Sequence, residues 1–232
     1  EMNKYGRKLQ NSEILTMVPN VNAIVAGTEL YDTKVLDAAD KLRVISRLGV
    51  GIDNIDINYA KKKGIKVFKT QTTPALAVAE LTLGLILSLL RKINIHNNDL
   101  KSNKWHKQIG SLLRGKTLGI VGLGTIGKKL VEITSGLQMN YVAYDVLYDN
   151  SFMGKHKIEH CNFNELLKKS DIISIHTNMS KENMDMFNDE EFKRMKRSSI
   201  LINTSRGRVV NERGLVNAIK NGIISGAGLD VY

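Results

Sequence analysis

A glycine-rich turn between a strand pattern and a helix pattern constrains the fold more than any other feature of the sequence. The apolar run Thr117–Val121 leads into Gly-Leu-Gly-Thr-Ile-Gly at residues 122–127, and a helical pattern follows at once. The next strand pattern, 141–144, ends at Asp145. A G-x-G-x-x-G turn in this setting, with an acid about 20 residues later, is typical of α/β units that bind a dinucleotide. The sequence therefore predicts a parallel sheet built around this turn.

Each position of the turn has a physical role in that interpretation. Gly122 permits the tight turn, Gly124 lets the backbone approach a pyrophosphate, and Gly127 allows the helix to pack closely on the strand. The start of the helix offers unpaired N–H groups and a positive dipole end to the phosphates. Asp145 can accept hydrogen bonds from ribose hydroxyls and would repel an extra phosphate, so the pattern favours NAD over NADP. The alternative is a tight turn that binds no ligand.

Short apolar runs alternate with helical patterns along almost the whole chain, which predicts an α/β fold with parallel sheets. The other expected strands are residues 22–27, 43–48, 65–68, 171–176, 199–203 and 225–231. The other expected helices are residues 33–39, 57–63, 164–169, 189–196 and 211–220.

A long apolar helix interrupts this alternation. We expect Thr73 as its N-cap, Pro74 as its first helical position and an end near Leu90. We also expect it to be buried on most sides between two domains, with the boundary near Arg91 and domains of residues 1–90 and 91–232. Because little precedes the first strand and no helix pattern follows the last, we expect this sequence to be a piece of a longer protein.

Composition excludes several classes of protein. The single cysteine, Cys161, cannot form an internal disulfide, and the N-terminal residues do not resemble a signal peptide. The longest apolar stretch contains Glu80 and is too short to span a membrane. The net charge of +11 lies mostly in residues 91–232, but Trp105 is the one aromatic residue in its densest run, whereas nucleic-acid grooves interleave several. We expect a soluble, cytoplasmic protein with no membrane, nucleic-acid or metal partner.

Two further strand ends carry candidate binding groups. Arg206 stands among small residues after a predicted strand, where its fork of donors can reach a carboxylate or carbonyl oxygen. Gly49 and Gly51 leave backbone N–H groups unobstructed after another strand, which suits an anion. The alternatives are a solvated arginine and a structural turn capped by Asp53 or Asn54.

Together these motifs resemble the D-isomer specific 2-hydroxyacid dehydrogenase family. The shared segments, in the family's order over nearly the whole chain, are RLGVGIDNID, AVAELTLGLIL, GKTLGIVGLGTIGK with a following YD, IHT, NTSRGRVV and GAGLDVY. The resemblance implies two Rossmann-like or flavodoxin-like parallel-sheet domains, with residues 1–90 as an incomplete substrate-binding domain and residues 91–232 as the NAD-binding Rossmann domain. The family commonly has Pro at the position of Gln71, which affects local loop shape.

The resemblance also implies roles for individual residues. Val50 and Gly51 would hold the substrate carboxylate, flanked by Arg47, and Arg206 would be the catalytic arginine. The residues expected to bind NAD are Thr70, Val78, Gly122, Gly124, Thr125, Ile126, Gly127, Asp145, Thr177, Thr204 and Asp230. Within that set, the nicotinamide side is assigned to Thr70, Val78, Thr204 and Asp230, and the adenine pocket to Thr177.

The family's catalytic Glu and His are expected beyond Tyr232, so we expect residues 1–232 alone to be inactive. In the complete enzyme, a His supported by a Glu would remove the hydroxyl proton as hydride passes from C2 to the nicotinamide. The histidines present match no catalytic position, and His176 ends a strand on the adenine side.

The substrate and the partners are narrower questions. The segments around RLGVGIDNID and AVAELTLGLIL are most similar to phosphoglycerate dehydrogenases, so 3-phosphoglycerate is the expected substrate, with glyoxylate or hydroxypyruvate as the alternative. A regulatory protein that keeps the fold and senses NAD is a rival from another class, and a nucleic-acid binder is a third. The expected assembly is a homodimer or a higher homo-oligomer.

Overall fold

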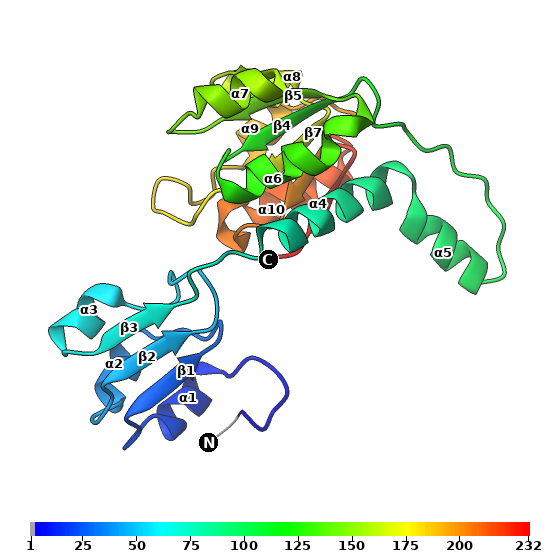
Figure 1. The fold of residues 1–232 in the computed structure, drawn as a ribbon. Coiled ribbons are helices and arrows are strands. Elements are labelled where there is room, and N and C mark those ends of the chain that lie inside the picture. The colour runs from blue at the N-terminus through cyan, green and yellow to red at the C-terminus, as the bar shows by residue number, and fades with distance from the viewer. Residues whose placement is uncertain (1–2) are drawn as a thin grey trace. The chain divides into compact units, whose positions relative to one another are not determined.

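The computed structural model describes residues 3–232 and divides the chain into two compact units, one ending at Thr73 and the other spanning Pro74–Tyr232 (Figure 1). The division lies before the long helix α4 (Ala75–Leu90), not after it near Arg91 as the sequence suggested. The reason is packing, because α4 contacts the helix after the glycine-rich turn and two strands of the second sheet.

Helix α4 differs from expectation in two further ways. Its N-cap is Pro74, with no side-chain cap, so Thr73 does not start the helix. Its buried residues repeat at helical spacing along one face, as with Ala79 and Ile86, while Leu76 and Leu81 stay exposed. The helix is therefore buried along one stripe, not on most sides.

The first unit is a three-stranded parallel sheet with helices against one face. Its strands, in the order β1-β2-β3, are β1 (Ala23–Ala26), β2 (Val44–Arg47) and β3 (Lys66–Lys69). Its helices are α1 (Asn11–Met17), α2 (Thr33–Ala38) and α3 (Ile57–Lys62). Leu36 and Ile45 lie in the core, while Val25 and Phe68 are exposed on the other face.

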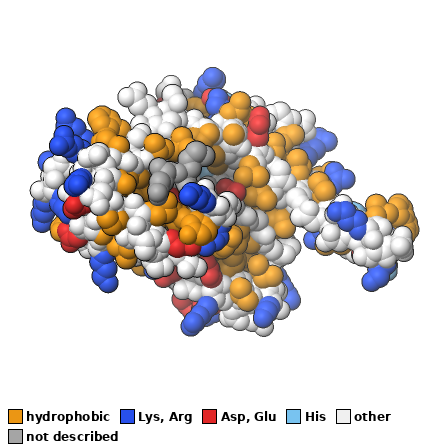
Figure 2. All heavy atoms as spheres, turned by 90° about the horizontal axis from the view of Figure 1, so that it is seen from below, with side chains coloured by type: hydrophobic (Ala, Val, Ile, Leu, Met, Phe, Trp, Pro, Cys, Tyr) orange, Lys and Arg blue, Asp and Glu red, His pale blue; other side chains and the backbone are white. Residues whose placement is uncertain are grey.

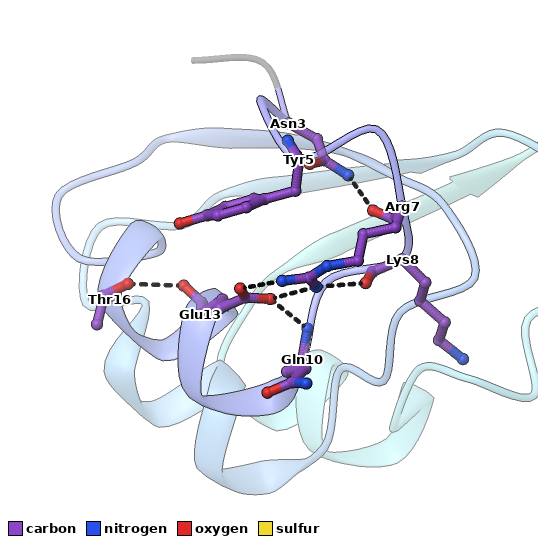
Figure 3. A network of polar contacts seen from close by, with 7 residues as sticks. All are labelled: Asn3, Tyr5, Arg7, Lys8, Gln10, Glu13 and Thr16. Atoms are coloured by element: carbon purple, nitrogen blue, oxygen red, sulfur yellow. Dashed lines mark hydrogen bonds and ion pairs between the residues drawn. The ribbon is translucent and has the colours of Figure 1, made fainter.

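Helix α1, which the sequence pattern did not reveal, is held at its start by a network of polar contacts (Figure 3). The Arg7 guanidinium donates to both carboxylate oxygens of Glu13, and the backbone N–H of Gln10 donates to one of them at 2.7 Å. These bonds lower the pKa of Glu13 to about 2. A short helix with little apolar periodicity thus has polar contacts at its N-terminus.

The second unit is a six-stranded parallel sheet in the order β6-β5-β4-β7-β8-β9. Its strands are β4 (Thr117–Val121), β5 (Asn140–Tyr144), β6 (Ile158–His160), β7 (Ile172–Ile175), β8 (Ile200–Asn203) and β9 (Gly226–Leu229). Besides α4, its helices are α5 (Ile93–Lys101), α6 (Thr125–Thr134), α7 (Asn150–His156), α8 (Phe163–Lys169), α9 (Asp189–Arg194) and α10 (Glu212–Lys220), with short 3-10 turns η1 (Ser135–Leu137) and η2 (Gly207–Val209). The predicted α/β class with parallel sheets is confirmed.

Both faces of this second sheet are covered. Ile120 of β4 packs in one core with Ile86 of α4 and other apolar residues, and Ile173 of β7 packs in another with Phe192 of α9. Strands buried on both faces show continuous apolar runs, which is what the sequence pattern had. Within residues 3–232, no helix combines the length and apolar character needed to cross a membrane.

Candidate functional site

The carboxyl ends of the six parallel strands meet at one edge of the second sheet. Strand order reverses between β4 and β7, and ligands of such sheets bind in the crevice outside the carboxyl ends at this point. Predicted site residues follow five of the strands there: Gly122, Asp145, Thr177, Thr204 and Asp230. The fold thus brings to one edge residues that are spread over more than 100 positions of sequence.

The three glycines of the turn after β4 differ in their surroundings. Gly122 has φ +97°, and a Cβ there would lie 2.9 Å from the backbone of His176. A Cβ on Gly127 would overlap the carbonyl oxygen of Gly122. Gly124 has no heavy atom within 4 Å of the corresponding position, so one side of its backbone is open. Two glycines are therefore needed for packing, and the third leaves room for a ligand.

The start of α6 lies at that open position. Gly124 is the N-cap and provides no side chain, and Lys128 N–H closes the first turn onto the Gly124 carbonyl at 2.9 Å. The N–H groups of Thr125 and Ile126 belong to the first turn, where a helix supplies no acceptor of its own. Such N–H groups with the helix dipole favour a phosphate.

Asp145 is held firmly against the glycine-rich turn. One carboxylate oxygen accepts the Leu123 N–H at 2.6 Å, and the other accepts from Val146 and Leu147 at 2.7 and 3.2 Å. A carboxylate has about four lone-pair sites, so it can still accept from a ribose hydroxyl. Val146 and Leu147 are exposed and apolar, and they offer no cation for a 2′-phosphate.

Two buried polar atoms at the end of β7 have no hydrogen-bond partner among residues 3–232: Nδ1 of His176 and Oγ1 of Thr177. The buried Ser174 hydroxyl lies 2.9 Å from His176 Nε2. Because that hydroxyl needs an acceptor for its proton, Ser174 donates to Nε2 and the imidazole proton resides on Nδ1. Burial lowers the pKa of His176 to about 4, so the ring is neutral at pH 7. A neutral N–H group and a hydroxyl group, both without a partner among residues 3–232, thus lie in residues next to Gly122, which fits a bound dinucleotide.

His176 was not among the residues expected to bind the cofactor. The signal that could have found it is its position, because it is the first polar residue after the buried strand β7 at the point where strand order reverses.

The turn after β8 that carries Arg206 is built from buried side chains. Asn203, 1% exposed, donates from Nδ2 to the Arg206 carbonyl at 2.9 Å. Its Oδ1 accepts from the N–H and the hydroxyl of Ser205 at 3.0 and 2.9 Å. The Arg206 guanidinium donates to the Ser205 carbonyl at 2.9 Å. Asp230 joins the same place, since its N–H donates to the Asn203 carbonyl at 3.0 Å.

The residues expected to hold the substrate carboxylate lie in the first unit, at the carboxyl edge of its sheet. Val50 and Gly51 follow β2 and are half-buried. Thr70 follows β3, and its hydroxyl accepts the Gly49 N–H at 3.0 Å, so it braces the loop after β2. The expectation that the Gly49 N–H is open to an anion is therefore wrong, because it is bonded within the loop. Arg47 donates to the Leu48 carbonyl, while its buried Nε has no partner in the part of the chain that the structure describes.

The alternative interpretation of the loop after β2, a structural turn capped by Asp53 or Asn54, is wrong about the capping residue. Neither Asp53 nor Asn54 is the N-cap of α3; Asp56 is, accepting the Tyr59 N–H at 2.9 Å. Asn54 instead donates to the carbonyls of Gly27 and Glu29 at 3.1 and 2.6 Å. Val78 of α4, expected on the nicotinamide side, belongs to the second unit, and its carbonyl accepts from Thr82.

Comparison with known proteins identifies the family. Residues 83–232 match the D-isomer specific 2-hydroxyacid dehydrogenase, NAD binding domain. D-3-phosphoglycerate dehydrogenase of Archaeoglobus fulgidus is 36% identical over 97% of this chain and 43% of its own length. Glyoxylate reductase of Thermococcus litoralis is 39% identical over 94% of this chain and 69% of its own. The structure of Aquifex aeolicus D-lactate dehydrogenase complexed with NAD and lactic acid superposes with a TM-score of 0.86, at 31% identity, over 94% of this chain and 66% of that one.

The chain belongs to the D-isomer specific 2-hydroxyacid dehydrogenase family, as its motifs predicted, and it carries that family's NAD-binding domain. It spans less than half the length of the A. fulgidus relative. Among residues 3–232, no cluster of three His, Cys, Asp or Glu side chains could hold a metal ion.

Proposed function

We propose that the protein is an NAD-dependent oxidoreductase that acts on the CH–OH group of a D-2-hydroxy acid. The observation that carries this proposal is that the glycine-rich turn, Asp145 and the turn with Arg206 all lie at the same edge of the second sheet. Bound NAD would supply the acceptor for the C2 hydride.

The chain's residues would bind and orient the two reactants. The N–H groups of Thr125 and Ile126 would hold the pyrophosphate, and Asp145 the adenosine ribose. Arg206, on a turn fixed by the buried Asn203, would orient the substrate and polarise its C2 oxygen. In the first unit, the backbone of Val50 and Gly51 with Arg47 would hold the carboxylate.

Proton transfer would need a group matched to neutral pH. The pKa of His176, about 4, suits a neutral donor to a ligand and not a proton carrier at pH 7. We therefore assign His176 to binding. In the whole protein, the resemblance to the family implies a His supported by a Glu for this step.

For the substrate we propose 3-phosphoglycerate, supported by the phosphoglycerate dehydrogenase among the relatives. The alternative, glyoxylate or hydroxypyruvate, is supported by the glyoxylate reductase. A panel decides between them: the whole protein is assayed with NADH and each of three keto acids, namely the 2-keto acid formed from 3-phosphoglycerate, glyoxylate and hydroxypyruvate. A kcat/KM for the 2-keto acid of 3-phosphoglycerate below that for both other keto acids would overturn the first choice. NADH binding without turnover of any of them would favour the regulatory alternative.

Arg206→Lys tests the role of the arginine. Lysine keeps the charge but lacks the planar fork of donors, so in the whole protein kcat/KM should fall by about 100-fold or more while NADH affinity changes little. Arg208→Lys, at an exposed position two residues later, is the matched control and should keep most activity. Near-normal turnover by Arg206→Lys would mean that the substrate is held elsewhere.

We also propose a homodimer, or a higher homo-oligomer, assembled through the segment 93–112. This segment includes α5 and projects at the right of Figures 1 and 2, with hydrophobic side chains on its surface. Its exposed large apolar residues are Ile93, Ile95, Leu100, Trp105, Ile109 and Leu112. An exposed apolar patch of this kind marks an interaction site. Light scattering of the chain should give at least twice the monomer mass, and Ile109→Lys should reduce it; a monomeric unmutated chain would contradict the proposal.

We further propose a cytoplasmic location, because a chain with the single cysteine Cys161 lacks the internal disulfides that are common in small secreted proteins. Fractionation of the source cells checks this.

A further inference from the structure

Two buried threonine hydroxyls join α4 to the turn that carries Arg206. Thr82 lies within α4, Thr204 directly follows β8, and their Oγ1 atoms are 3.1 Å apart across 122 positions of sequence. Thr82 is fully buried and Thr204 is 8% exposed. Thr82 Oγ1 also lies 2.8 Å from the carbonyl oxygen of Val78, one helical turn earlier. Buried as they are, these hydroxyl protons need acceptors within the protein.

The number of protons and acceptors fixes the direction of the two hydrogen bonds. Each hydroxyl has one proton. If Thr82 gave its proton to Thr204, the proton of Thr204 would have no acceptor in the contacts that the structure gives it. If Thr82 gives its proton to Val78, then Thr204 donates to Thr82, and both protons are bonded. The bonds therefore run from Thr204 to Thr82 to Val78.

We propose that Thr82 is a positioning residue for the Arg206 turn: by accepting the proton of Thr204, it fixes the end of β8 against α4 before any ligand binds. The proposal rests on the proposed function, in which this turn orients the substrate. The side-chain bonds of Asn203 stay within the turn, whereas the bond between Thr204 and Thr82 reaches another element.

The direction also limits what Thr204 can bind. With its proton committed to Thr82, the Thr204 oxygen can only accept. A ligand group that reaches this oxygen must be a donor, such as a carboxamide NH₂, and an acceptor at this position would be disfavoured.

The test uses Thr82→Val, which keeps shape and loses the acceptor, and Thr82→Ser, which keeps the hydroxyl. Thr134 in α6 is the matched control, because it is also buried, donates to the Leu130 carbonyl at 2.7 Å and accepts from the Tyr141 hydroxyl at 3.1 Å. Thr134 lies at the far end of α6 from the glycine-rich turn.

NADH affinity of the chain is measured by calorimetry. Because Thr204, expected on the nicotinamide side, then loses its bond to α4, Thr82→Val should weaken NADH affinity about 3- to 10-fold, the range expected for one lost hydrogen bond, and Thr82→Ser should restore it. Thr134→Val should lower Tm about as much as Thr82→Val does, and it should leave NADH affinity unchanged. Equal NADH affinities for Thr82→Val and Thr134→Val would overturn the positioning role. Failure of the unmutated chain to bind NADH would instead count against the proposed function.

A double-mutant cycle on Tm tests the bond direction without any ligand. Thr82→Val leaves the Thr204 proton buried and unbonded, so Tm should fall by roughly 2–8 °C. Thr204→Val leaves Thr82 bonded to Val78 and should cost less. The double variant should be more stable than Thr82→Val alone, because no unbonded proton remains. A larger loss for Thr204→Val than for Thr82→Val would overturn the direction.

Discussion

Two turns at the same sheet edge are built in opposite ways. The turn after β4 depends on what its residues lack, since a Cβ on Gly122 or Gly127 would meet backbone atoms. The turn after β8 depends on side-chain hydrogen bonds, since Asn203 bonds to the Arg206 carbonyl and Thr204 bonds to Thr82 of α4. One turn therefore exposes backbone N–H groups to a ligand, and the other presents a single charged side chain, Arg206, on a buried support. Backbone N–H groups suit the pyrophosphate, because every dinucleotide has one. A side chain suits the substrate, because the substrate differs between enzymes.

The largest effect should come from adding a methyl group to the first turn. At φ +97°, an alanine in place of Gly122 carries about 1–3 kcal/mol of backbone strain, with a similar cost for its overlap with His176. We expect Gly122→Ala to lower the free energy of unfolding, measured with urea, by the sum of the two, about 2–6 kcal/mol, and to abolish detectable NADH binding.

Gly124→Ala is the control within the same turn. Its φ is −77° and its Cβ position is open, so stability should change by less than about 0.5 kcal/mol while NADH affinity falls. Equal stability of the two variants would show that the turn is not built by backbone packing.

The next effect should come from removing the support of the second turn. Asn203→Ala loses the bonds to Ser205 and to the Arg206 carbonyl, so we expect a loss of about 1–3 kcal/mol in the free energy of unfolding. NADH affinity should fall only about 3- to 10-fold, because the phosphate turn is intact. Asn140→Ala, exposed at the opposite edge of the sheet, should be neutral. If Asn203→Ala abolished NADH binding as Gly122→Ala does, the two turns would not divide their roles.

The comparison also explains what sequence reasoning could find. Glycines at fixed spacing after a strand signal a packed backbone turn within a dozen residues, so Gly122, Gly124 and Gly127 were predictable. The contact between Thr82 and Thr204 spans 122 positions and involves ordinary helix and strand residues, so no local pattern reveals it. For the same reason, the unpartnered His176 Nδ1 emerged only from the structure.

The fold shows the same division. Strands β4, β7 and β8 are buried on both faces and produced clear apolar runs. Helix α5 has no buried residue and strand β6 has three residues at the sheet edge, so neither leaves a periodic pattern. Helix α7 was also missed, since Met153 is its one buried residue. The boundary at Thr73 was missed because the apolar face of α4 does not say which sheet it covers.

A smaller effect should come from the acid that holds the first turn. Asp145→Asn keeps an acceptor for the Leu123 N–H but removes the charge. We expect the ratio of NADPH to NADH dissociation constants, from calorimetric titration of each, to fall roughly 10-fold, with weaker ribose bonds and less repulsion of the 2′-phosphate. Binding of NADPH by the unmutated protein as tight as that of NADH would contradict the role of Asp145.

The smallest effect concerns pH and the side chain beside the first turn. The pKa of His176 is lowered to about 4 in the folded protein by burial, from 6.5. The unfolded chain therefore binds more protons between these values, so stability is full above pH 6.5 and is lost as pH falls toward 4. Between pH 7.5 and 6 the expected loss is roughly 1 kcal/mol in the free energy of unfolding.

His176→Gln should remove this part of the pH dependence, whereas His160→Gln, exposed at the end of β6, should keep it. Saturating NADH should raise the free energy of unfolding at each pH and leave this pH dependence in place, because between pH 7.5 and 6 the dependence comes from protonation of the unfolded chain. A pH profile of stability that is the same in His176→Gln and in the unmutated chain would show that the ring is solvated, and the unpartnered Nδ1 would then have no part in holding the dinucleotide.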